Sequence, residues 1–252
     1  MYLILCSSSD VSALWAYNAL QAMGLAPISL LTPEMLASSA AWEHHVGNAG
    51  SGVSLKLGGY GISDHTLQGV LNRLMGPPQV MIPQVAPADR DYALQEMSAF
   101  YLSWLNSLSC PVLNPATPQG LPGRWFHISE LVVLAHKAGL VTPTYRQSGA
   151  DPIEAGFQPL APAQAELKRV LVLKEEIFGT EVPAPLRERC SKLAKLCRTP
   201  LLGIDFYETA ESQWIFSYAT PFPDLQVGGP GFVQSLLRLL QKGKSNDSSV
   251  WH

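Results

Sequence analysis

The chain reads Gly203-Ile204-Asp205-Phe206, then a mostly polar stretch over 208–213, then Trp214-Ile215-Phe216-Ser217-Tyr218-Ala219-Thr220-Pro221-Phe222-Pro223. Both outer runs consist mainly of residues that favour strands, and the stretch between them is short enough for a tight connection. The prolines at the end cannot donate to a sheet ladder, so they mark a rigid exit from the second strand. The sequence therefore predicts a β-hairpin.

Periodicity predicts the segments around this hairpin. The apolar run Leu167–Leu173 predicts a strand, and the amphipathic patterns over Leu186–Cys197 and Gly231–Gln241 predict helices. Residues 146–165 contain repeated Gly and Pro and show neither period, so we expect a loop there. The polar tail over 244–252 is expected to be disordered.

A β-α-β pattern opens the chain. Tyr2–Cys6 and Ile28–Leu31 are short apolar runs, and Asp10 is well placed to cap a helix that Gly24 terminates. Such a pattern favours a parallel sheet covered by helices. Along the intervening helix, apolar residues repeat at helical spacing at Val11, Leu14, Trp15, Ala19 and Ala22.

The region between residues 41 and 87 has weaker signals. Apolar and polar residues alternate over Val53–Leu57 in a glycine-rich context, which predicts a half-exposed strand or hairpin within 41–61. Residues 64–71 fit either a short helix or a strand. The prolines between 77 and 87 exclude a regular helix, so this stretch is expected to be a surface loop or linker.

Clearer signals return at Asp89, which is expected to begin a long amphipathic helix. Val112–Pro115 then predicts a short strand that stops at a proline. Ser129 is expected to cap a helix over Glu130–Ala138. Val141–Tyr145 is strand-like and suits the edge of a sheet.

Composition is that of an ordinary soluble globular protein. The chain has 252 residues, of which 47% are apolar and 15% charged, enough for one large core or two smaller ones. A net charge of -3 gives no electrostatic case for a nucleic-acid partner. No apolar run approaches the roughly 18 residues that cross a bilayer, and the N-terminus lacks the basic start of a signal peptide. We therefore expect a cytoplasmic protein with no membrane partner.

The cysteines Cys6, Cys110, Cys190 and Cys197 form no C-x-x-C pair. Cys190 and Cys197 lie two helical turns apart, about 10 Å along the axis, which exceeds the reach of a disulfide. Buried free thiols are therefore expected. The six histidines are scattered, so the sequence predicts no metal site.

Several short motifs resemble, in the same order, those of the ATP-grasp carboxylate-amine ligases. This superfamily includes the ribosomal-protein glutamate ligases and the graspetide-maturing peptide ligases. Cys110–Pro115 resembles the family's P-V-x-N-P, residues 134–144 resemble A-x-x-A-G-L-x-x-P-x-T, and Arg169–Val172 resembles R-V-x-V. The predicted hairpin over 203–223 is similar to the family's closing pair, G-x-D-F with x-F-x-E-x-N-x-x-P.

The resemblance implies the fold class and the domains. We expect an α/β protein with an N-terminal parallel β-α-β unit over 1–86, similar to the domain that precedes the ATP-grasp domain. A truncated ATP-grasp-like α+β unit is then expected over 87–243, followed by the tail over 244–252.

The chain departs from the family at the residues that handle ATP. In the family, the Glu and Asn of the closing hairpin hold the Mg²⁺ that bridges the ATP phosphates, and Tyr218 and Thr220 occupy these positions here. Mg²⁺ prefers carboxylate oxygens, and neither a phenol nor a hydroxyl is anionic at neutral pH. The family also inserts a lid subdomain with a phosphate-binding lysine between the positions of Thr144 and Arg169, where this chain has no lysine before Lys168.

These departures imply that ATP-dependent ligation is lost. The chain would then serve as an accessory protein in a biosynthetic or peptide-modification pathway, binding a peptide, a small carboxylate-containing ligand or a partner enzyme. No catalytic residue, metal or cofactor is expected in that case, and a homo-oligomer is compatible with it. The alternative is an active carboxylate-amine ligase that binds ATP and Mg²⁺ in an atypical way. A third hypothesis is an unrelated α/β enzyme with Ser8 or Cys6 as nucleophile, although no G-x-S-x-G elbow supports it.

The hairpin and its neighbours supply five of the seven candidate ligand-binding residues: Arg169, Asp205, Tyr218, Thr220 and Asp224. Asp205 is the carboxylate that the motif retains, but it also fits a turn residue. Arg169 can bind an anion or pair with a neighbouring carboxylate. Asp224 precedes two glycines that permit close approach of a ligand, or simply form a turn into the last helix.

The other two candidates are Asn72 and Arg73. A guanidinium binds carboxylates through two hydrogen bonds, so Arg73 can bind a substrate carboxylate. Structural pairing of Arg73 with Asp64 or Glu96 is the alternative.

Overall fold

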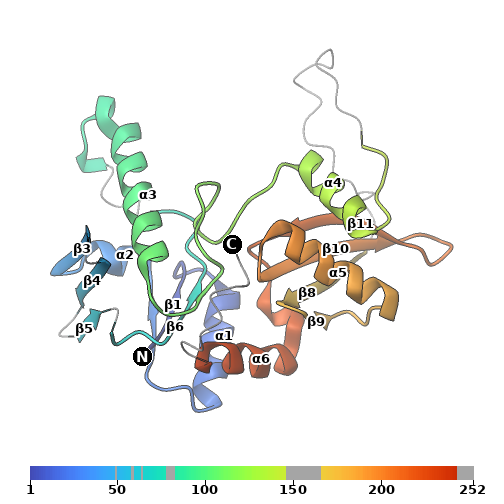
Figure 1. Cartoon of the computed structure of the whole chain (residues 1–252), viewed down its shortest axis with the longest axis horizontal. Coiled ribbons are helices and arrows are strands. Elements are labelled where there is room, and N and C mark those ends of the chain that lie inside the picture. The colour runs from blue at the N-terminus through green and yellow to red at the C-terminus, as the bar shows by residue number, and fades with distance from the viewer. Residues whose placement is uncertain (49, 58–59, 64, 78–82, 146–165, 243–252) are drawn as a thin grey trace. The chain divides into compact units, whose positions relative to one another are not determined.

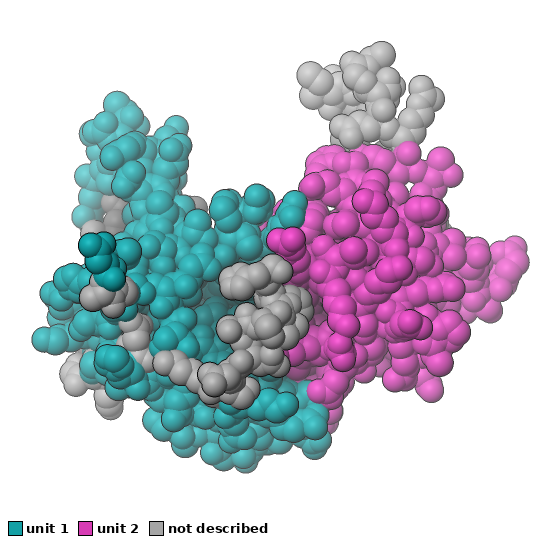
Figure 2. All heavy atoms as spheres, in the orientation of Figure 1, with its two compact units in different colours: residues 1–124, 233–252 teal, residues 125–232 magenta. Residues whose placement is uncertain are grey.

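The computed structural model describes residues 1–242 except 49, 58–59, 64, 78–82 and 146–165. The chain divides into two compact units, residues 1–124 with 233–252 (unit 1) and residues 125–232 (unit 2), which Figure 2 shows in different colours. The division predicted between 86 and 87 falls within unit 1. The predicted tail over 244–252 and the predicted loop over 146–165 lie outside the described residues.

Unit 1 contains a four-stranded parallel sheet in the order β2-β1-β6-β7. Figure 1 labels its two central strands, β1 and β6. Its strands are β1 (Tyr2–Leu5), β2 (Ile28–Leu31), β6 (Gly69–Asn72) and β7 (Val112–Leu113). β1 pairs in parallel with both β2 and β6, and β6 pairs in parallel with β7. The β-α-β opening and the α/β fold class are confirmed.

Helix α1 (Val11–Ala22) connects β1 to β2, and Asp10 caps it by accepting a hydrogen bond from the Ala13 amide. The expected apolar face is wrong in part, because Val11 and Leu14 are exposed. The buried residues are instead Ser12, Ala13, Ala16 and Leu20. Small side chains let a helix lie close to its neighbours, which a count of apolar residues does not reveal.

A second sheet of unit 1 is antiparallel, in the order β3-β4-β5. It comprises β3 (Ala41–Gly47), β4 (Gly50–Leu57) and β5 (Tyr60–Ser63), and α2 (Pro33–Ala37) precedes it. The alternation predicted within β4 is confirmed, since Val53 and Leu55 are buried while Ser54 and Lys56 are exposed.

Helix α3 (Arg90–Ser107) follows the short 3₁₀ helix η2 (Pro87–Asp89) and joins the core of unit 1. Its Tyr101 and Trp104 pack with Leu3 and Leu5 of β1 in one hydrophobic cluster. Trp42 of β3 meets three rings of α3 edge-on, with centroid distances of 4.7 to 5.1 Å. These contacts explain why α3 belongs to unit 1.

Unit 2 contains an antiparallel sheet in the order β11-β10-β8-β9. Its strands are β8 (Leu167–Leu173), β9 (Glu176–Gly179), β10 (Leu201–Glu208) and β11 (Trp214–Thr220). The predicted hairpin is therefore confirmed as β10–β11. The strand-like stretch Val141–Tyr145 is not a strand; the Val141 carbonyl accepts one hydrogen bond from the Phe216 amide.

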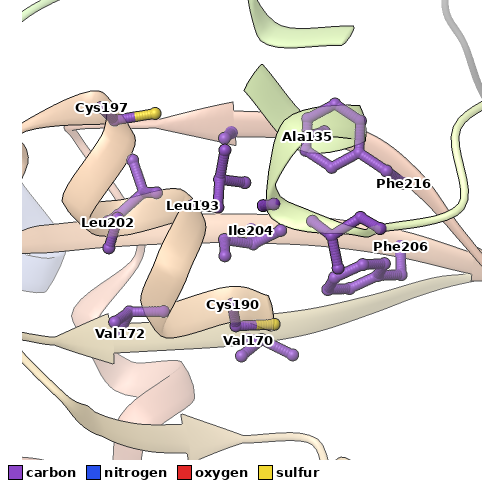
Figure 3. Packing of buried hydrophobic residues seen from close by; sticks show 14 of the residues in the cluster. Ala135, Val170, Val172, Cys190, Leu193, Cys197, Leu202, Ile204, Phe206 and Phe216 are labelled. Atoms are coloured by element: carbon purple, nitrogen blue, oxygen red, sulfur yellow. The ribbon is translucent and has the colours of Figure 1, made fainter. Parts of the chain in front are cut away.

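Helices α4 (Ile128–Ala138) and α5 (Ala184–Cys197) cover one face of this sheet. Figure 3 shows Leu193 of α5 and Ala135 of α4 beside Ile204 and Phe206 of β10. The cap of α4 is His127, which forms a capping box with Glu130, rather than Ser129 as expected. After β11 come η3 (Leu225–Gly228) and α6 (Gly229–Gln241), which continues from unit 2 into unit 1. None of the described helices combines the length and apolarity that a bilayer span requires.

All four cysteines are buried and free, which confirms the expectation for Cys190 and Cys197. Burial raises the pKa of the Cys190 thiol to about 12 and that of Cys6 to about 11. Protonated, buried thiols react slowly. We expect little labelling of the native protein by a thiol reagent and four reactive thiols after denaturation without reductant. Fewer than four would indicate a disulfide.

Candidate functional site

Three candidate residues stand in one row across the sheet of unit 2. Arg169 of β8 pairs with Asp205 of β10, and Asp205 pairs with Tyr218 of β11. Directly paired residues of antiparallel strands project from the same face, so this polar row forms one surface. Ile204 and Phe206 flank Asp205 along β10 and belong to the hydrophobic cluster under α4 and α5. Asp205 and Arg169 therefore project from the opposite face of the sheet.

A β-bulge sets the position of Tyr218. Asp205 pairs with Tyr218 and Phe206 with Phe216, so Ser217 has no partner on β10. Without the bulge, Phe216 and Tyr218 would project from one face, because side chains alternate along a strand. The extra residue lets Phe216 enter the core while Tyr218 pairs with Asp205, with its half-buried ring at the margin of the same cluster. Bulges commonly redirect a side chain in this way at functional sites.

The electrostatics show that the three polar heads influence one another. The pKa of Asp205 is raised, chiefly because its carboxyl is desolvated, and the Arg169 guanidinium opposes this rise. The pKa of Tyr218 is also raised, by desolvation and by the charge of Asp205. Arg169 is exposed, whereas Asp205 and Tyr218 are half-buried.

The polar groups at the ends of these three side chains retain their hydrogen-bonding capacity. No side-chain hydrogen bond joins Arg169, Asp205 or Tyr218 to another described residue. Half-buried polar groups without partners are unfavourable, so a ligand that supplies hydrogen bonds would stabilise them. The polar row is therefore suited to bind a polar group.

The neighbouring row on one side is covered by the chain that leaves β11. Leu171, Gly203 and Thr220 form this row by their strand pairing. A Cβ atom on Gly203 would lie 2.7 Å from the Cβ of Pro223, so only glycine permits this approach. The Thr220 hydroxyl accepts a hydrogen bond of 3.1 Å from the Phe222 amide. Thr220 thus has a structural role at the end of the strand.

The row on the other side is apolar in character. Leu167 pairs with Tyr207, and Tyr207 pairs with Ile215. Leu167 is 37% exposed and Ile215 is 7% exposed, while Tyr207 is half-buried. This apolar row lies on the same face as the polar row, because Asp205 and Tyr207 are two residues apart on β10.

Asp224 caps the short helix η3. Its carboxylate accepts a hydrogen bond of 3.1 Å from the Gln226 amide, and its side chain is exposed. This contact is the turn into the last helix that the sequence allowed as an alternative. Its role in ligand binding stays a prediction.

Asn72 and Arg73 lie at the carboxyl end of β6 in unit 1, and both are buried. The Asn72 amide donates to the carbonyls of Asn114 and Leu121. The Arg73 guanidinium contacts Asp10 through two hydrogen bonds, of 2.7 and 3.2 Å.

Asp10 is therefore a partner of Arg73. The expectation of Glu96 is wrong, and Asp64 lies outside the described residues. Arg73 follows the carboxyl end of β6, and Asp10 ends the connection from the neighbouring parallel strand β1 to α1, which explains how residues so far apart in sequence meet. Ligand binding by Asn72 and Arg73 stays a prediction, since both have structural partners here.

Of the two nucleophiles hypothesised at the end of β1, Cys6 has no support in the geometry, and the role of the exposed Ser8 stays a prediction. Cys6 is fully buried, and its pKa is raised by burial and by the charge of Asp10. The Ser7 and Ser9 hydroxyls hydrogen-bond to each other at 3.0 Å.

The polar row predicts a pH dependence of stability. A raised carboxyl pKa means that folding favours the protonated form, so this contribution is fully present below the ordinary pKa of 3.8 and lost as pH rises through the higher folded-state value. We therefore expect Asp205→Asn to raise Tm relative to wild type, by a margin that grows between pH 4 and pH 8. Asp224→Asn, which keeps an equivalent cap, is the control for the substitution itself. A difference in Tm between Asp205→Asn and wild type that shrinks as pH rises would contradict a raised pKa of Asp205.

No protein-family model matches the chain, and no curated protein matches it. Among solved structures, the macrocyclase MdnC bound with precursor peptide MdnA, from Microcystis aeruginosa MRC, matches with a TM-score of 0.71 and 17% identity. The match covers 96% of this chain and 99% of that chain. The ATP-grasp ligase PsnB complexed with minimal precursor, Mg and ADP has a TM-score of 0.68 and 15% identity, covering 96% and 98%.

A Chryseobacterium gregarium RiPP-associated ATP-grasp ligase, in complex with ADP and a leader and core peptide, has a TM-score of 0.66 and 11% identity, covering 96% of this chain and 93% of that chain. The chain has the ATP-grasp fold. The resemblance read from the short motifs is thereby confirmed at the level of the fold. The predicted absence of a lid falls mainly on residues 146–165, which lie outside the described part of the chain.

Sequence reasoning identified all three members of the polar row but missed their surroundings. The bulge at Ser217 and the apolar row were not anticipated. One signal was available: Phe216 and Tyr218 are both large and lie two residues apart, so a regular strand would project both from the same face.

Proposed function

We propose that this protein is an ATP-grasp-fold ligand-binding protein that does not catalyse ATP-dependent ligation. The observation that carries the proposal is the placement of Tyr218 directly opposite Asp205, with Thr220 one row further and bonded to the Phe222 amide. This pair of strands would have to supply the magnesium ligands of an ATP-grasp ligase.

The residues present do not fit Mg²⁺. The ion requires near-octahedral coordination by hard oxygens, and it is usually held by one or two carboxylates together with waters and substrate phosphates. Here Asp205 is one carboxylate whose pKa is raised by desolvation, and the pKa of Tyr218 is raised as well, so its phenol stays neutral. Across the described residues, no group of three or more His, Cys, Asp or Glu is placed to hold a metal.

A peptide or a small carboxylate-containing ligand is the proposed partner. The polar row offers a guanidinium, a carboxyl and a phenol whose hydrogen bonds are not used within the described protein. Of the structures of similar fold, MdnC is bound with a precursor peptide, PsnB with a minimal precursor and the Chryseobacterium gregarium ligase with a leader and core peptide, which supports a peptide-modification setting. We propose an accessory role in such a pathway.

The alternative is an active carboxylate-amine ligase with atypical nucleotide binding. Retention of Asp205 and the similarity to structures that contain ADP favour it. Phosphate release from ATP, measured with and without a candidate peptide, separates the two functions. Turnover by the wild-type chain would establish the ligase.

A further inference from the structure

We propose that the polar row and the adjoining apolar row together bind a free α-amino acid with an apolar side chain. This inference rests on the proposed ligand-binding function and names the class of ligand. The polar row is Arg169, Asp205 and Tyr218, and the apolar row is Leu167, Tyr207 and Ile215. Each set spans β8, β10 and β11, so the two rows lie side by side.

The charges of the polar row favour a ligand that carries a positive and a negative group close together. Arg169 contributes a positive charge and Asp205 a negative one, and they stand on adjacent strands. A ligand with only a carboxylate would face repulsion from Asp205, and one with only an ammonium would face repulsion from Arg169. An α-amino acid carries both charges, so its ammonium can donate to Asp205 while its carboxylate accepts from Arg169. Hydrogen bonds between charged groups are the stronger ones.

The spacing of the strands matches the separation of the ammonium and the carboxylate in an α-amino acid. Neighbouring strands lie about 4.8 Å apart, and one carbon joins the ammonium and the carboxylate of an α-amino acid. The two groups can therefore reach side chains on adjacent strands. Tyr218 lies on the other side of Asp205. Its hydroxyl has no hydrogen bond within the described protein and can donate to the carboxylate of the ligand.

The apolar row provides a place for the ligand's side chain. Leu167 is 37% exposed, so apolar surface is accessible beside the charged heads. Tyr207 is half-buried and Ile215 is buried, so the protein around them holds these two side chains in place. The covered row on the other side, where Pro223 lies against Gly203, leaves no equivalent space. The side chain of the ligand is therefore directed toward the apolar row.

The first test uses the wild-type full-length chain and five matched probes in calorimetric titrations. The probes are L-leucine, glycine, 3-methylbutylamine, 4-methylpentanoate and N-acetyl-L-leucine. L-leucine is expected to bind saturably, and glycine about tenfold or more weakly because it buries no side chain. The amine and the two carboxylates each lose one charged contact and should bind about 10-fold to 100-fold more weakly. Binding of N-acetyl-L-leucine as tight as that of L-leucine, or no binding of L-leucine, would overturn the proposal.

The second test assigns the binding to the two rows. Arg169→Ala and Asp205→Asn are each expected to weaken L-leucine binding about 10-fold to 100-fold, and Tyr218→Phe about tenfold. Arg189→Ala and Glu188→Gln remove exposed charges from α5, which covers the other face of the sheet, and should leave binding unchanged. Thermal unfolding confirms that each variant is folded. Unchanged binding in folded Arg169→Ala and Asp205→Asn would refute the site.

Failure of the amino-acid site can be distinguished from failure of the proposed function. Absence of L-leucine binding together with absence of phosphate release refutes the amino-acid site alone. Phosphate release from ATP refutes the proposed function whether or not L-leucine binds.

Discussion

Asp10→Asn is expected to destabilise the protein by about 3–5 kcal/mol, because it leaves the Arg73 guanidinium buried opposite a neutral group. The side chains of Arg73 and Asp10 are only 3% and 6% exposed, and their closest contact is 2.7 Å. Removing one partner of a buried ion pair is far more damaging than the net stability of the pair would indicate. Urea denaturation of the variant and the wild type measures the difference.

Asparagine is the informative substitution because Asp10 has two roles. Its carboxylate also caps α1 by accepting from the Ala13 amide, and asparagine caps about as well as aspartate. Asp10→Ala should therefore lose about 1 kcal/mol more than Asp10→Asn. Glu43→Ala, which removes the exposed partner of His45, is the control and should change stability little. A loss of less than about 1 kcal/mol in Asp10→Asn would show that water reaches the guanidinium.

Double replacement provides a further check. Asp10→Asn combined with Arg73→Met removes both charges and fills similar volume, so it is expected to be more stable than Asp10→Asn alone. This order of stabilities distinguishes the loss of the negative charge opposite Arg73 from a general disruption of the β1 and β6 ends. The opposite order would favour a role for Arg73 beyond its pairing with Asp10.

Sequence patterns predicted elements whose signals are local. Alternation identified the inner residues Val53 and Leu55 of β4, and a short polar segment between two strand-forming runs identified the β10–β11 hairpin. Asp10 was also identified as a helix cap, since that contact spans three residues. Each of these features depends on neighbours along the chain.

Features that depend on distant contacts were not predictable in the same way. The pairing of Arg73 with Asp10 joins the ends of two parallel strands, and no spacing in the sequence specifies it. The buried face of α1 uses Ala13 and Ala16 rather than the larger Val11, because packing against the sheet depends on fit and not on apolarity alone.

The bulge at Ser217 is the clearest case for the candidate site. Sequence alone placed Tyr218 and Thr220 at the positions of metal ligands, but it could not show that an unpaired residue brings Tyr218 into one row with Asp205 and Arg169. The register of three strands determines the polar row, and register arises from the pairing of whole strands. A row of this kind can be identified only when the pairing of all three strands is known.

The wild-type protein is expected to show no Mg²⁺-dependent ATP hydrolysis, and Tyr218→Glu with Thr220→Asn is expected not to restore it. The substitutions supply a carboxylate and an amide at the positions that hold Mg²⁺ in the family. However, the chain has no lysine between Thr144 and Lys168 to stabilise the charge on the phosphates. Loss of one preorganised electrostatic donor typically lowers a rate about 10²-fold to 10³-fold.

The structure adds two reasons why the double variant should fail. The carboxylate introduced by Tyr218→Glu would stand directly opposite Asp205, where desolvation already raises the carboxyl pKa, so the pair would favour protonation over metal binding. Thr220→Asn would also remove the hydroxyl that accepts from the Phe222 amide, which holds the exit from β11. Two ligands placed on a sheet without their supporting contacts do not make a magnesium site.

Phosphate release under saturating ATP and Mg²⁺ is the deciding measurement, made with and without a candidate precursor peptide and with an active ATP-grasp ligase as positive control. The wild type and the double variant should both remain at the rate of a no-protein control, and circular dichroism should show that the variant is folded. Peptide-dependent turnover by the wild type would mean that the peptide completes a nucleotide site, and the ligase function would then replace the proposed one. Turnover by the double variant alone would mean that the two metal ligands are the missing parts, because every other group needed to stabilise the transferring phosphoryl group would have to be present already.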